Sequence, residues 1–212
     1  ATEDHDFDEI NYFNFKGKKV AWNRNDGGAV GRFSTTGLED VFEVFSAHLG
    51  NSKNANFLKN LFSEAYLQHD NLAAATRFIA NELFGKHGLV IVDGDDKELK
   101  KLLIPFIKDD LVNETSFTEV SKTISDLEND YKIQVNPRNI NLFYLDENSR
   151  ERIVFENDLY KINNTNLQFS KEEILKEVES HPEKFSPNVL LRPLYQEVIL
   201  PNLCYIGGGG EI

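Results

Sequence analysis

Residues 88–93 read Gly88-Leu89-Val90-Ile91-Val92-Asp93 and decide the predicted fold. A short β-branched run after a glycine is typical of a strand that is buried on both faces, as in parallel sheets. A polar turn follows, and Asp95 with Glu98 three residues later predicts a capping box for a helix that continues to Ile107. Strand, turn and helix form the βα unit of an α/β fold, in which ligands sit beyond the carboxyl ends of parallel strands.

Helical periodicity is clear on both sides of this unit. Apolar residues at spacings of three and four predict amphipathic helices. These helices cover residues 38–49, 55–69, 72–83 after a cap at Asp70 or Asn71, 116–131, and 170–180 with a capping box of Ser170 and Glu173.

Alternating apolar and polar residues predict short antiparallel strands elsewhere. One hairpin is expected over residues 11–20 around Gly17, and a second joins residues 141–145 to 152–155, with 159–162 as a third strand. The sequence therefore predicts an α/β protein in which helical and hairpin segments accompany the parallel sheet.

The composition is that of a globular chain with an acidic excess. Of its 212 residues, 40% are hydrophobic and 27% are charged, and the formal net charge is −12. This negative field disfavours nucleic acid as the main partner, because it repels a phosphate backbone. The longest uncharged apolar stretch, residues 198–206, is shorter than the roughly 18 residues that cross a bilayer, so no membrane partner is expected.

Cysteine content bears on compartment and chemistry. Cys204 is the single cysteine, which excludes an intrachain disulfide and a Cys-rich zinc site and favours a reducing compartment, the cytoplasm. Its position in an apolar run predicts a small buried hydrophobe in a strand rather than a nucleophile.

The densest group of titratable residues lies near the start of the chain. Residues 3–9 carry five carboxylates and one imidazole, among them Asp4, His5 and Asp6. Such a group is able to bind a divalent cation or to provide an acid/base pair. The alternative is an acidic first helical turn, which the helix dipole favours.

Two further groups predict anion binding. Pro193 suits the first turn of a helix, which places Arg192 at its start and on one polar face with Gln196, near Asn188 and Ser186. The glycines Gly207, Gly208, Gly209 and Gly210 follow an apolar run, where backbone N–H groups can approach a phosphate or carboxylate. The alternatives are a surface ion pair for Arg192 and a flexible tail for the glycines.

Other polar residues have structural explanations. Asp93, Asp95 and Asp96 match turn and capping chemistry. The histidines His48, His69, His87 and His181 are isolated near predicted helix ends, where a catalytic role is not expected.

Four stretches carry a resemblance to a known family. They are residues 3–10 (Glu-Asp-His-Asp-Phe-Asp-Glu-Ile), residues 88–93, residues 185–197 (Phe-Ser-Pro-Asn-Val-Leu-Leu-Arg-Pro-Leu-Tyr-Gln-Glu), and residues 200–212, which contain Leu-Pro and end Tyr-Ile-Gly-Gly-Gly-Gly-Glu-Ile. In this order they resemble the bacillithiol biosynthesis cysteine-adding enzymes, the BshC family, over essentially the whole chain.

The resemblance implies a fold and a division of the chain. It implies a Rossmann-like core similar to class I aminoacyl-tRNA ligases and nucleotidyltransferases, built here from residues 1–10, 86–112 and 186–212. Connecting-peptide insertions would cover residues 11–85 and 113–185. Family members also have an upstream Thr-Gly-Gln-Gln segment and a C-terminal coiled coil that forms a homodimer. The chain starts at Ala1 and contains no methionine, so we expect an excerpt that is inactive alone.

The resemblance also implies an activity, the addition of L-cysteine to glucosaminyl malate. ATP would activate the cysteine, and Mg²⁺ or a local arginine would screen the negative charges. His5 with Asp4 and Asp6 would orient the reacting amine or a cation, Arg192 with Asn188 and Gln196 would contact an anionic substrate group, and residues 207–210 would contact nucleotide or substrate.

Two other functions remain open from the sequence. The chain could be a catalytically silent nucleotide- or metabolite-binding module, or an interaction scaffold without a pocket. The distance between His5 and Arg192 would separate the ligase from both.

Overall fold

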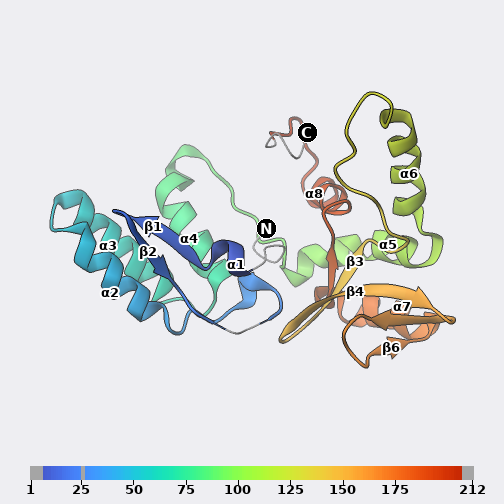
Figure 1. Ribbon diagram of the computed structural model, residues 1–212, viewed down its shortest axis with the longest axis horizontal. Helices are drawn as coiled ribbons and strands as arrows, with labels where there is room; N and C mark the ends of the chain where they lie inside the picture. The colour runs from blue at the N-terminus through green and yellow to red at the C-terminus, as the bar shows by residue number, and fades with distance from the viewer. Residues whose placement is uncertain (1–6, 25–26, 207–212) are drawn as a thin grey trace. The chain divides into compact units, whose positions relative to one another are not determined.

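The computed structural model describes residues 7–24 and 27–206, and the chain divides into two compact units, residues 1–95 and 96–212. Figure 1 shows the helices and strands of each unit. The predicted assignment of residues to a core and two insertions is a different kind of division and stays a prediction.

The first unit opens with a short helix and a hairpin. Helix α1 (Phe7–Ile10) precedes β1 (Tyr12–Phe15) and β2 (Lys18–Ala21), which pair antiparallel with Tyr12 opposite Ala21. Gly17 has a φ of 77°, a left-handed conformation that is cheap for glycine, so the chain reverses there. The predicted hairpin is confirmed.

Three helices and two 3₁₀ turns follow the hairpin in the described residues of the first unit. They are η2 (Val30–Arg32), α2 (Leu38–Leu49), α3 (Lys53–Tyr66), α4 (Leu72–Phe84) and η3 (Gly85–His87). The predicted cap of α4 is confirmed at Asn71, whose side-chain oxygen accepts a hydrogen bond from the Ala74 N–H at 2.9 Å. Helix α2 ends at Leu49, and Gly50 is its C-cap, as expected.

Apolar side chains from the hairpin, η2 and α2 form the core of the first unit. Its buried members are Val20, Trp22, Val30, Phe33, Leu38 and Val41. Phe7 packs edge-on against Trp22 and Phe33, with ring centroids 5.6 and 5.5 Å away, and so joins α1 to this core.

The predicted buried strand at residues 88–93 is wrong. These residues form no described strand, and Val90 is 80% exposed. A strand persists only when its backbone N–H and C=O groups pair with a neighbour, and no described strand lies beside this segment. The segment is apolar, as a buried strand would be, but an apolar composition does not by itself supply a pairing partner.

The second unit begins with two helices. Helix α5 (Lys97–Asn113) is capped by Asp96, whose carboxylate accepts from the N–H groups of Glu98 and Leu99 at 2.8 and 3.2 Å. The predicted cap, Asp95, is thus wrong by one residue. Helix α6 (Thr115–Leu127) follows directly.

A five-stranded antiparallel sheet lies beside these helices. Its spatial order is β6-β5-β4-β3-β7. The strands are β3 (Leu142–Asp146), β4 (Ser149–Glu156), β5 (Leu159–Ile162), β6 (Gln168–Phe169) and β7 (Phe185–Pro187). The predicted hairpin and third strand are confirmed, but every described strand pair is antiparallel, so the predicted parallel sheet is not confirmed.

Two helices and a 3₁₀ turn complete the second unit: α7 (Lys171–Ser180), η4 (Pro182–Lys184) and α8 (Arg192–Ile199). The capping box of Ser170 and Glu173 is confirmed in both directions. In Figure 1, α7 lies against the sheet. Side chains of α5, α7, α8 and the sheet share one core, which includes Leu103, Ile107, Tyr144, Ile174, Phe185 and Tyr195.

The end of the described chain also differs from expectation. Residues 201–206 form no strand, and Cys204 is exposed, so the prediction of a buried strand cysteine is wrong. Among the helices of the described residues, none combines the length and apolarity needed to cross a membrane.

Candidate functional site

The predicted site residues fall into two groups. Asp4, His5, Asp6 and the glycine run 207–210 lie outside the described residues. Asn188, Arg192 and Gln196 are described and all belong to the second unit. Among the described residues, the candidate site therefore lies at the start of α8.

Apolar contacts fix the start of α8. The helix begins at Arg192 with Pro193 in its first turn, as predicted. Leu191 and Tyr195 are buried in the core of the second unit, and the Tyr195 N–H donates to the Leu191 carbonyl at 3.0 Å. One side of the helix is anchored in this way, while Arg192 and Gln196 stay partly exposed on the other.

The guanidinium of Arg192 is held by two side chains. Its Nη1 donates to Oε1 of Gln196 at 3.1 Å, and its Nη2 donates to the hydroxyl of Tyr205 at 3.0 Å. The predicted shared polar face of Arg192 and Gln196 is confirmed. The part of Tyr205 was missed, because the apolar residues around it favoured a strand over a contact with α8.

Asn188 has a structural role in the turn before α8. Its Oδ1 accepts from the N–H groups of Leu190 and Leu191 at 2.9 and 3.2 Å. Its carbonyl accepts from the Arg192 N–H at 2.9 Å. Asn188 thus sets the path of the chain into the helix that carries Arg192.

The same asparagine is tied to a buried polar group. Its Nδ2 donates to Oδ1 of Asn141 at 2.9 Å, and its N–H donates to the Asn141 carbonyl at 3.0 Å. Asn141 is 1% exposed and also bonds to Arg138 and to Ser116 Oγ. Its own N–H donates to Oδ2 of Asp110 at 2.8 Å.

Asp110 is the buried acid of this group. It is 2% exposed, and Ser116 donates to its other oxygen. Burial raises the pKa of the Asp110 carboxyl above its ordinary value, although the hydrogen bonds from Ser116 and Asn141 act in the opposite direction. The sequence held a signal for it: Asp110 continues the apolar spacing of Leu103 and Ile107, so it lies on the core face of α5.

Ser186 does not join the Arg192 face. It lies in β7 opposite Phe143 and is fully buried. A buried strand residue cannot reach a ligand at the surface of α8, so its predicted place in the anion group is wrong.

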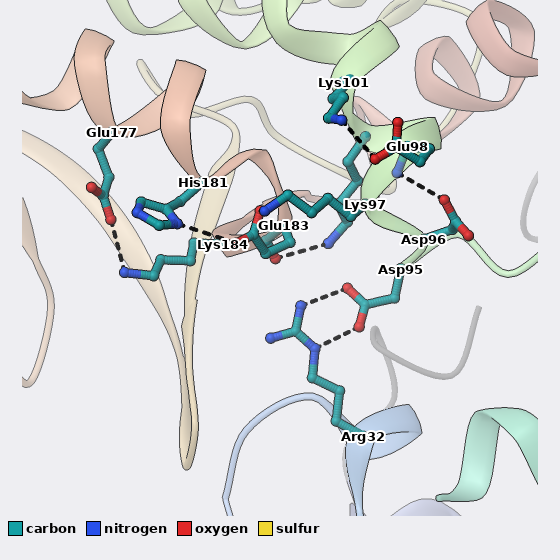
Figure 2. Close-up of polar contacts among 11 residues, drawn as sticks. Arg32, Asp95, Asp96, Lys97, Glu98, Lys101, Glu177, His181, Glu183 and Lys184 are labelled. Atoms are coloured by element: carbon teal, nitrogen blue, oxygen red, sulfur yellow. Dashed lines mark hydrogen bonds and ion pairs between the residues drawn. The ribbon is translucent and has the colours of Figure 1, made fainter.

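Figure 2 shows the charged residues around the start of α5 and the end of α7. In the second unit, Lys97 pairs with Glu183 at 3.2 Å, and Lys184 pairs with Glu177 at 2.9 Å. In the first unit, Arg32 pairs with Asp95. Most of these carboxylates and amines are already matched, which favours a structural role over substrate binding.

The remaining predicted polar residues also take part in local contacts. The Asp93 carboxylate accepts from the Asp95 N–H at 3.0 Å, as expected for a turn. His48 contacts a carbonyl of its own helix, α2, His69 contacts the Glu64 carbonyl of the preceding helix α3, and His181 contacts Glu183. In the described parts of the chain, no three His, Cys, Asp or Glu side chains gather as a metal site.

Two cavities lie in the described part of the first unit. One cavity of about 190 Å³ is lined almost entirely by apolar side chains, among them Trp22, Phe62 and Tyr66. A more open hollow of about 500 Å³ lies between α4 and residues 89–91. Neither contains the predicted anion-binding residues.

Comparison with known proteins identifies the chain's relatives. Residues 1–212 match the family described as "Bacillithiol biosynthesis BshC, N-terminal Rossmann-like domain". Proteins named "Putative cysteine ligase BshC" from Flavobacterium johnsoniae and Flavobacterium psychrophilum are 62% and 65% identical over 212 residues. A protein of the same name from Cytophaga hutchinsonii is 43% identical over 213 residues.

These alignments cover all of the present chain but only 39–40% of each relative, so the chain spans about two fifths of their length. The match confirms the predicted family and its Rossmann-like class. The chain belongs to the BshC family of bacillithiol biosynthesis proteins, in the part that forms the N-terminal Rossmann-like domain.

Proposed function

We propose that this chain is the substrate-binding part of a ligase that joins L-cysteine to glucosaminyl malate and so forms bacillithiol. The observation that carries the proposal is the Arg192 guanidinium, which Gln196 and Tyr205 hold at the start of α8. A planar guanidinium held from two sides is suited to a carboxylate or phosphate, which it binds through paired N–H groups.

The charge of the substrates explains the need for such a group. Glucosaminyl malate is a dicarboxylate and ATP is a polyanion, whereas the chain has a net charge of −12. Like charges repel within the low-dielectric surroundings of a site, so a local cation has to offset the field of the chain. Arg192 supplies that charge, while Gln196 orients it and Asn188 shapes the turn that presents it.

ATP would provide the driving force for amide formation. The cysteine carboxylate would attack the α-phosphate and release pyrophosphate, and the sugar amine would then displace AMP from the cysteinyl adenylate. The contribution of the protein would be to position the reactants and to stabilise charge. We keep Asp4, His5, Asp6 and residues 207–210 as proposed contacts for the amine and the nucleotide.

Magnesium has no ligand set among the described side chains. No step of the proposed reaction is therefore assigned to it, and Arg192 is the group that we propose for charge screening.

The test uses the full-length protein. Supplied with ATP, L-cysteine and glucosaminyl malate, it should form a product with the mass of bacillithiol. Arg192→Ala should lower turnover or weaken substrate binding at least tenfold, as loss of a charge-assisted contact does. Lys122→Ala removes one positive charge from an exposed position of α6 and is the matched control.

The results of this experiment distinguish the ligase from the alternative functions and test the role of Arg192. A folded, intact protein that binds ATP but forms no product would favour a catalytically silent nucleotide-binding module. Product formation that is the same in Arg192→Ala and Lys122→Ala would remove Arg192 from the site.

A further inference from the structure

Asp110 and Asn141 form a hydrogen-bonded pair that is almost closed to solvent. They come from α5 and from the residue before β3, and they are 2% and 1% exposed. Two such polar groups are costly to bury unless all their hydrogen-bonding atoms are matched. Here the Asp110 oxygens accept from Ser116 and Asn141, and the Asn141 side chain bonds to Ser116, Arg138 and Asn188.

This pair continues towards the surface without a break. Asp110 accepts from the Asn141 N–H, Asn141 accepts twice from Asn188, and the Asn188 carbonyl accepts from the Arg192 N–H. The bonds along this path measure 2.8–3.0 Å. A buried acid is therefore connected, through two asparagines, to the first residue of the helix that presents the guanidinium.

Stability alone does not account for such a network. Well-packed apolar side chains of similar volume are often as stabilising as a buried polar group or more so. What apolar packing lacks is direction, because hydrogen bonds fix the orientation of the groups that they join. The directed part of the network ends at the turn before α8, where orientation decides how Arg192 is presented.

We propose that Asp110 and Asn141 are positioning residues that act through Asn188 to hold Arg192 in the orientation in which it binds a substrate carboxylate or phosphate. The inference rests on the proposed function of Arg192. It adds two buried residues of the core to the binding machinery, although neither of them touches the ligand.

The experiment is a double-mutant cycle in the full-length protein. Asp110→Asn preserves size and one acceptor oxygen but replaces the other acceptor with a donor, so it disturbs the network with little loss of packing. Glucosaminyl malate and ATP are titrated separately by calorimetry, and the ligand whose affinity falls in Arg192→Ala is then followed. Asp110→Asn should weaken its binding about threefold to tenfold in the presence of Arg192 and have no effect on it in the Arg192→Ala background.

Asp109→Asn is the matched control. Asp109 precedes Asp110 on α5, but its carboxylate bonds locally, to Asn113 Nδ2 at 2.6 Å. This variant should leave ligand affinity unchanged. Ser116→Ala is a second, milder disturbance of the network and should show the same dependence on Arg192 if Asp110→Asn does not fold.

Thermal unfolding of each variant separates positioning from folding. A purely structural role predicts that the affinity losses of Asp110→Asn and Arg192→Ala add, and that result would overturn the inference while leaving Arg192 in the site. If Arg192→Ala binds both ligands like the unmodified protein, the proposed function of Arg192 fails and the inference fails with it.

Discussion

Arg32 and Asp95, which are 63 residues apart in the sequence, form a bidentate ion pair in the first unit. Nε and Nη2 of Arg32 reach the two oxygens of Asp95 at 2.5 and 2.8 Å (Figure 2). The next residue, Asp96, has a different task and caps α5. Two consecutive acids thus have different roles. Asp95 joins the end of the first unit to η2, and Asp96 caps the first helix of the second unit.

The energy of the Arg32–Asp95 pair is expected to be modest. The two side chains are 36% and 17% exposed, so solvent screens much of their attraction. A double-mutant cycle of Arg32→Ala and Asp95→Ala, followed by urea unfolding of the full-length protein, should give a coupling energy of about 0.5–1 kcal/mol, which decreases with added salt. A coupling energy near zero would mean that the Arg32–Asp95 ion pair does not persist in solution.

The cap at Asp96 should contribute more than its neighbour to helix α5. Asp96→Ala leaves two backbone N–H groups without their acceptor and should destabilise the protein by about 1 kcal/mol. Asp96→Asn retains an acceptor oxygen and should recover most of that loss. Hydrogen exchange at the Glu98 and Leu99 amides is the direct measurement, and equal exchange in both variants would contradict the assignment of the cap.

Local signals predicted the helices and antiparallel strands well. Asn71 and the pair Ser170–Glu173 act on N–H groups only a few residues away, so their effect can be read from the sequence. The same holds for the hairpin turn at Gly17, which needs a left-handed backbone. Local signals did not decide between Asp95 and Asp96 as the cap of α5, because either acid suits that position. The choice depends on the distant Arg32, which forms an ion pair with Asp95 and leaves Asp96 as the cap.

Features that depend on distant partners could not be predicted from the sequence. Residues 88–93 have the composition of a buried strand, but strand formation requires a neighbour that the described chain does not place there. Asp110 lies at an otherwise apolar position of α5. Its carboxylate can be buried because it accepts a hydrogen bond from the N–H of Asn141, 31 residues away. Arg192 and Gln196 could be paired on a helical wheel, whereas Tyr205 lies beyond the helix and could not.

A pH-dependent contribution to stability is expected from Glu177. Its Oε1 accepts from the Tyr144 hydroxyl at 2.8 Å and from Lys184 Nζ at 2.9 Å. Burial alone would raise the pKa of Glu177, but these hydrogen bonds outweigh burial and leave the pKa below its ordinary value. A lowered pKa in the folded state means that the stabilisation is present above the ordinary pKa of about 4.3 and is lost as the pH falls through the folded pKa.

Glu177→Gln should therefore unfold at lower urea concentration than the unmodified protein at pH 6–7, and the two midpoints should approach each other below about pH 4. Glu119→Gln alters an exposed glutamate on α6 and serves as the control. A difference between Glu177→Gln and the unmodified protein that stays constant from pH 7 to pH 3 would show that the carboxylate charge is not the source of the stabilisation.

Tyr205→Phe tests how far the second contact of Arg192 serves binding. The hydroxyl accepts from Nη2 of Arg192 at 3.0 Å, and Tyr205 is 42% exposed, so removal of the hydroxyl should change stability little. Without it the guanidinium loses one of the two side chains that orient it and has to be ordered further when the anion binds. The KM for the anionic substrate should therefore rise about threefold at unchanged kcat. Tyr131→Phe makes the same change at a more exposed tyrosine and should match the unmodified protein. A lower KM in Tyr205→Phe would show instead that the hydroxyl competes with the substrate for Arg192.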